Sequence, residues 1–66
     1  MHELGIAHDL VEIASSAAAA AHVQQVGVVH VRLGTLSGVV KDALMFSYDI
    51  AAAGTVLEGS RLEIEE

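Results

Sequence analysis

The first three residues of the chain could bind a metal ion through main-chain as well as side-chain atoms. The sequence begins Met1-His2-Glu3, and a bulky second residue generally prevents removal of the initiator methionine. The Met1 amine, the backbone nitrogen of His2 and its imidazole can then close fused rings around one ion, with the backbone of Glu3 next in line as a fourth donor. Nitrogen donors in one plane suit Ni(II) or Cu(II), and the Glu3 side chain could tune the site from outside. Alternatively, His2 is a solvated residue at a frayed chain end.

The other three histidines have simpler structural interpretations. His8 precedes Glu12 by one helical turn, which predicts an exposed surface pair. His22 falls at the end of the same predicted helix, where a charged imidazole suits the helix dipole. His30 alternates with valines in a predicted strand and is expected on the outer face, beside Arg32.

Motifs typical of enzymes are not found in this sequence. His2 and His8 are six residues apart, about 240° around a helix, so they cannot share an ion as the paired histidines of zincin hydrolases do. The loop 34–38 lacks the Lys-Ser/Thr that completes a phosphate-binding loop, and there is no Gly-x-Ser-x-Gly element. We therefore predict that the chain is not an enzyme.

Composition excludes several classes of function. The 66 residues suffice for one small domain, which we assign to residues 1–66. Nine acidic and three basic residues give a net charge of −6, which disfavours nucleic acid as a partner. Without cysteine there can be no disulfide or thiolate-bound zinc. The N-terminus does not resemble a signal peptide, and polar residues interrupt the uncharged run 13–31, so we expect a cytoplasmic protein that contacts no membrane.

Hydrophobic spacing predicts a small α+β fold with four elements. These are a helix over residues 2–21, a strand over 26–33, a helix over 40–53 and a strand over 61–65. In the last strand Glu63 and Glu65 are expected to form a solvated face. A strand–helix–strand connection of this length normally joins parallel strands, so we predict a two-layer sandwich with both helices on one face of the sheet.

The predicted sheet is incomplete. A parallel sheet of two strands with two open edges is a poor structure on its own. We expect either a third strand from outside this sequence or a strand supplied by a second chain. The open edge and the alanine run 17–21 therefore predict a homo-oligomer.

The chain resembles the HypA/HybF family of hydrogenase-maturation nickel chaperones. The resemblance rests on the N-terminal Met1-His2-Glu3-Leu4, on the segment VRLGTLSGVV at residues 31–40, and on similar residues along the second helix and second strand. It runs almost unbroken from residue 1 to residue 66. It implies Ni(II) bound at the N-terminus and His2, a role for Glu3 in nickel binding and partner recognition, and delivery to the large subunit of [NiFe] hydrogenase together with a nickel-handling GTPase. Some family members also serve urease.

The sequence departs from the family pattern in ways that matter. Family members continue into a zinc domain with two Cys-x-x-Cys pairs and return with a final strand. Neither is present in these residues, so no zinc is expected here. We thus predict a nickel metallochaperone domain with Met1, His2 and Glu3 as metal-site residues. The alternative is a metal-independent interaction or assembly module.

Overall fold

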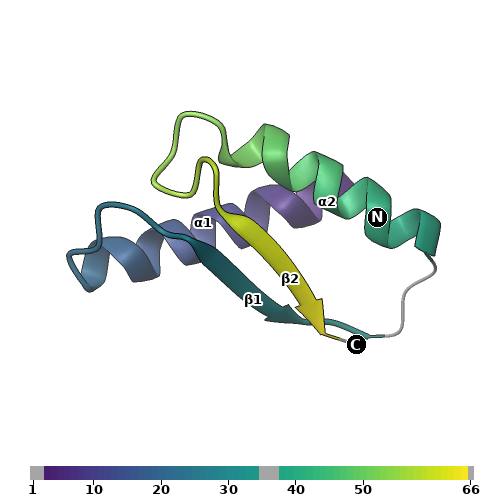
Figure 1. The fold of residues 1–66 in the computed structure, drawn as a ribbon, viewed down its shortest axis with the longest axis horizontal. Helices are drawn as coiled ribbons and strands as arrows, with labels where there is room; N and C mark the ends of the chain where they lie inside the picture. The colour runs from purple at the N-terminus through teal and green to yellow at the C-terminus, as the bar shows by residue number, and fades with distance from the viewer. Residues whose placement is uncertain (1–2, 35–37, 66) are drawn as a thin grey trace.

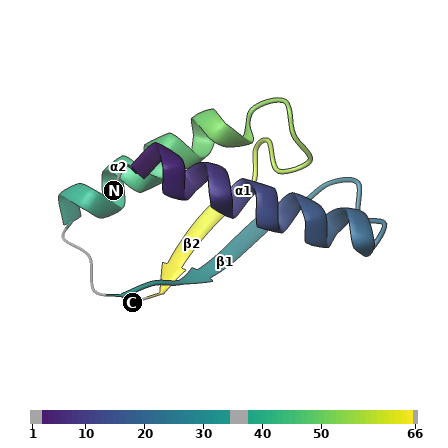
Figure 2. The same cartoon turned by 180° about the vertical axis from the view of Figure 1, so that it is seen from behind.

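The computed structural model describes residues 3–34 and 38–65, which form two helices and a two-stranded sheet. Along the chain these are α1 (Glu3–Ala20), β1 (Val28–Arg32), α2 (Gly38–Ala52) and β2 (Arg61–Glu65). Both helices lie on the same face of the sheet, as the two opposite views show (Figures 1 and 2). This arrangement confirms the α+β class and the α-β-α-β order predicted from the sequence.

The two strands are parallel, and their register separates apolar from charged residues. On the helix side it pairs Val29 with Leu62 and Val31 with Ile64, and on the outer side His30 with Glu63 and Arg32 with Glu65. The first strand was predicted over residues 26–33 but is shorter at both ends. The pairing continues slightly further, because Leu33 N–H donates to the carbonyl of Glu65 (2.9 Å) and Arg61 N–H donates to that of Gly27 (2.9 Å).

Both helices, the connection after α2 and strand β2 contribute residues to one apolar core. The core contains two residues of α1, three of α2, one of the following connection and one of β2, namely Ala7, Val11, Leu44, Tyr48, Ala52, Leu57 and Leu62. Not every apolar residue of α1 faces this core, since Leu4 and Ile13 are 52% and 69% exposed. Ile13 lies about 200° around the helix from Val11, which turns it away from the sheet.

The end of α1 is closed by a left-handed residue that is not glycine. His22 has a φ of 59°. Its N–H donates to the carbonyl of Ala19 (3.1 Å), and Val23 N–H donates to that of Ala18 (2.8 Å). These two bonds form the Schellman motif, which satisfies carbonyls that a helix end leaves unpaired. The motif reverses the chain toward β1.

Helix α2 begins two residues earlier than the predicted start at Val40. Its inner stripe includes the buried Leu44 and Tyr48, whereas Phe46 and Ile50 are exposed. Gly54 follows the helix with a φ of 79°, as expected of a residue just past a helix end. Among the residues that the structure describes, no helix is both long and apolar enough to cross a bilayer.

The connection from α2 to β2 is tied down by its own side chains. The Thr55 hydroxyl donates to the carbonyl of Ala52 (2.7 Å) and accepts from Leu57 N–H (3.0 Å). The Glu58 carboxylate accepts from Gly54 N–H (3.0 Å). These bonds fix the backbone on both sides of Leu57. The Leu57 side chain is fully buried, so the connection forms part of the core.

Candidate metal centre

Of the three residues predicted to bind the metal ion, the structure describes the backbone of one. Met1 and His2 lie outside the described residues, and Glu3 is the first residue of the helix. The first four N–H groups of a helix have no acceptor within it. The backbone nitrogen of Glu3 therefore gives up no helical hydrogen bond if it serves as a donor to a metal ion.

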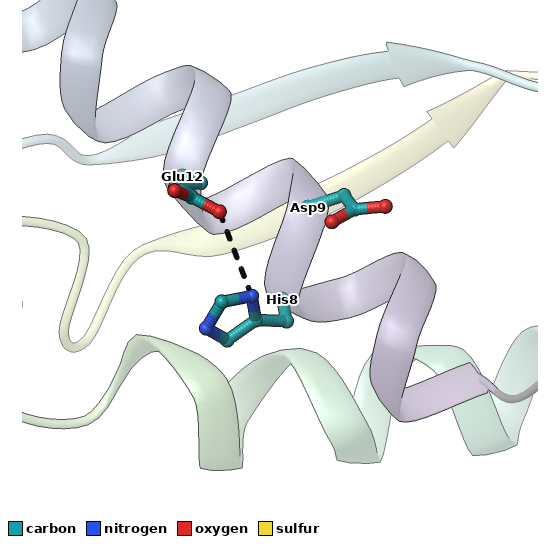
Figure 3. Close-up of side chains that lie close together, drawn as sticks. All are labelled: His8, Asp9 and Glu12. Atoms are coloured by element: carbon teal, nitrogen blue, oxygen red, sulfur yellow. Dashed lines mark ion pairs between the residues drawn. The ribbon is translucent and has the colours of Figure 1, made fainter.

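A second group of possible ligands lies further along α1 (Figure 3). His8, Asp9 and Glu12 each offer one ligand atom, and these atoms all lie within 4.8 Å of one another. His8 Nδ1 lies 3.7 Å from Glu12 Oε2. All three side chains are exposed, and residues 3–34 and 38–65 contain no other such group.

Helical spacing alone accounts for this group. Residues 8 and 12 lie one above the other on successive turns, which confirms the pair predicted between His8 and Glu12. Asp9 was missed as a third potential ligand, although the spacing His-Asp-x-x-Glu was visible in the sequence. The group is separated from the chain start, because His8 lies five residues beyond Glu3, about 7.5 Å along the helix axis.

The acidic residues of β2 are paired with basic side chains on the outer face of the sheet. Glu63 contacts both His30 Nε2 (2.6 Å) and an Arg61 guanidinium nitrogen (2.6 Å). Glu65 contacts Arg32 (2.7 Å). These contacts lie at the surface, and each contributes little to stability because water screens charges there. They support the predicted solvated face and give the two carboxylates partners other than a metal ion.

Comparison with known proteins gives a match along the whole chain. Residues 1–66 match the family described as "Hydrogenase/urease nickel incorporation, metallochaperone, hypA". A hydrogenase maturation factor HypA from Roseiflexus sp. (strain RS-1) is 73% identical over all 66 residues. Proteins of the same name from Chloroflexus aurantiacus and Nostoc punctiforme are 61% and 46% identical over the same 66 residues.

The match covers only part of each relative. It includes 100% of this chain but 54% of the Roseiflexus protein, 58% of the Chloroflexus protein and 56% of the Nostoc protein. The chain thus spans about half the length of the curated relatives that it matches. Both the start of α1 and the His8 group lie within the matched residues.

Proposed function

Because the chain belongs to the HypA family of nickel-incorporation metallochaperones, we propose that it binds Ni(II) at its N-terminus and delivers the ion during maturation of [NiFe] hydrogenase. The observation that supports this is the extent of the family match, which begins at residue 1 and so includes Met1-His2-Glu3. Hydrogenase is the proposed client because the relatives are named hydrogenase maturation factors. Urease, which the family description also names, is the second.

The nickel ion is cargo in this proposal. The Met1 amine, the His2 backbone nitrogen and the His2 imidazole hold it in one plane, with the backbone of Glu3 as fourth donor. A planar site leaves both axial faces of the ion open. A receiving protein can therefore add a ligand before the chaperone releases its own. The Glu3 carboxylate is not one of the four donors in this proposal, and it tunes nickel binding from outside the set of ligands.

The proposed partners follow from this role. They are a nickel-handling GTPase and the hydrogenase large subunit in the cytoplasm, with no substrate chemistry by this chain. We also propose that the 66-residue chain forms a homo-oligomer through an open sheet edge. A metal-independent interaction module is the second candidate, favoured by the exposed side chains of Phe46 and Ile50, which lie one turn apart on α2.

A nickel titration of four proteins tests the proposal. They are the chain with its native N-terminus, His2→Ala, a form with extra residues before Met1, and His8→Ala as a matched control on the same helix. A chelate that uses the terminal amine binds nickel only in the native and His8→Ala forms.

Other patterns assign nickel elsewhere. Binding that survives the extension but not His2→Ala requires a site made of side chains alone. Binding lost in His8→Ala but kept in the extended form places the ion on the group of Figure 3. If the native form binds no nickel, the proposed chelate is excluded and the metal-independent interaction module is the remaining candidate.

A further inference from the structure

Gly5 is a glycine that the geometry of α1 does not require. It lies in the first turn of the helix, which begins at Glu3. Left-handed backbone accounts for Gly54 and Gly59, whose φ values are 79° and 81°, but Gly5 is not among the glycines with a positive φ. A Cβ added at Gly5 would meet no atom of the described residues within 4 Å. Neither close packing nor an unusual conformation therefore calls for glycine at this position.

The effect that glycine does have here is to weaken the first turn of the helix. Glycine loses more backbone freedom than alanine when it becomes helical, and this disfavours the helical form by a factor of about five. The neighbouring Leu4 offsets little of this cost, since its side chain is 52% exposed in the part of the chain that the structure describes. Residues 3–5 are therefore held mainly by the main-chain hydrogen bonds of the turn.

The part of α1 that follows Gly5 is anchored in the core. Ala7 is fully buried and Val11 is 6% exposed, and Ile6 packs against the same cluster. Burial of these apolar side chains fixes the helix from residue 6 onward. Residues 3–5 can consequently leave the helical form without disturbing the core, and Gly5 stands at the boundary between the two parts.

We propose that the first turn of α1 opens about Gly5 and that this opening lets nickel leave the chelate. The inference rests on the N-terminal chelate proposed above. In the closed turn, the helical pattern gives the carbonyl of Glu3 a hydrogen bond from Ala7 N–H, so the main chain that carries the fourth donor is fixed. Opening the turn frees it, and the donors can then leave the ion one at a time. The His2 peptide nitrogen regains its proton from water as it leaves.

An opening turn of this kind has a specific kinetic signature. Alanine at position 5 stabilises the closed turn in the free chain and in the nickel-loaded chain alike. If nickel enters and leaves through the open turn, both rates fall by the same factor and the affinity does not change. A residue that acted on the chelate itself would change the affinity. The comparison of rate with affinity therefore distinguishes an opening turn from a direct effect on the ligands.

Amide hydrogen exchange and nickel transfer test the proposal with Gly5→Ala. The N–H groups of Ala7, His8 and Asp9 bond to carbonyls of the first turn in the helical pattern, so their exchange reports its opening. In the variant, exchange at these three amides should slow about five-fold. Transfer of nickel to EDTA should slow by a similar factor, with the affinity for nickel unchanged. Ser16→Ala, an exposed position later in the same helix, is the control and should change none of these quantities.

Three results would overturn the proposal. Unchanged exchange in Gly5→Ala would mean that glycine does not weaken the first turn. Slower exchange with unchanged nickel transfer would mean that the opening does not control release, and a changed affinity would mean that residue 5 acts on the chelate itself. A native chain that binds no nickel would refute the proposed function, and the titration detects that failure separately from the exchange measurement.

Discussion

The hydroxyl groups of Tyr48 and Ser60 lie 2.6 Å apart in the interior and share a hydrogen bond. Tyr48 is fully buried on α2, and Ser60, the residue before β2, is 6% exposed. Burying a phenol hydroxyl without a hydrogen-bond partner would lower the stability of the fold. The hydroxyl of Ser60 therefore allows Tyr48, the largest fully buried side chain, to occupy the core. The bond also joins the end of the α2–β2 connection to the helix that precedes it.

Removing either hydroxyl should destabilise the fold. Tyr48→Phe and Ser60→Ala are each expected to lower the free energy of unfolding by about 1–2 kcal/mol, because each leaves one buried hydroxyl unpaired. The double variant should cost less than the sum of the two, with a coupling of about 1 kcal/mol. Urea denaturation of the four proteins measures this cycle. Simple additivity would mean that the bond contributes nothing to stability.

Periodicity in the sequence predicted the framework of this core but not its closure. The stripe through Leu44 and Tyr48 was visible because helical spacing repeats it. Leu57 and Ser60 lie in a non-repeating connection, so no periodic signal marks them as buried. Their positions depend on the turn bonds of Thr55 and on two left-handed glycines, Gly54 and Gly59, and these local turn features do not appear as a periodic apolar pattern.

Burial of Leu57 can be tested by truncation. Leu57→Ala should lower the free energy of unfolding by about 2–5 kcal/mol, since it removes a fully buried side chain and leaves a cavity. In a chain of this size, such a loss is expected to unfold much of the population. Val56→Ala, at the half-buried neighbouring position, is the control and should cost less. Circular dichroism during thermal unfolding is the measurement, and equal losses for the two variants would contradict the assigned burial.

The helix end at His22 offers a stabilising substitution. His22→Gly should raise the free energy of unfolding by about 1 kcal/mol, because a left-handed conformation costs an L-residue what glycine avoids. Gly54→Ala is the matched opposite change and should lower the free energy of unfolding by a similar amount, because φ is 79° there. No neighbouring atom lies within 4 Å of an added Cβ, so the loss would come from backbone strain and not from a clash. Thermal unfolding measures both. A destabilising His22→Gly would mean that the imidazole makes a contribution larger than the backbone strain.

A buried hydroxyl on α1 provides a second stabilising substitution. Ser15 Oγ is buried without a hydrogen-bond partner, and serine is a poorer helix former than alanine. Ser15→Ala should therefore raise the free energy of unfolding by about 1 kcal/mol. Ser16→Ala, at the exposed neighbour, changes helix propensity alone and should gain only a few tenths of a kcal/mol. Equal gains in denaturant titration would show that the Ser15 hydroxyl is satisfied in solution.

Residue spacing predicts one part of the candidate metal centre but not the other. The pair of His8 and Glu12 followed from helical geometry, and the structure places it as expected. The proposed chelate at Met1 and His2 would use main-chain donors, which every sequence has, so residue types alone cannot identify it. The proposal for His2 therefore rests on the family resemblance and not on the spacing of residues in this sequence.

Nickel binding should strengthen as the pH rises. The proposed chelate requires the Met1 ammonium and the His2 peptide nitrogen to lose protons when the metal binds, so affinity for Ni(II) should increase from about pH 6 to about pH 8. Calorimetry in buffers of different ionisation enthalpy measures the number of protons released. His8→Ala should leave both affinity and proton release unchanged, whereas His2→Ala should abolish binding. A pH-independent affinity would contradict ligation by the peptide nitrogen.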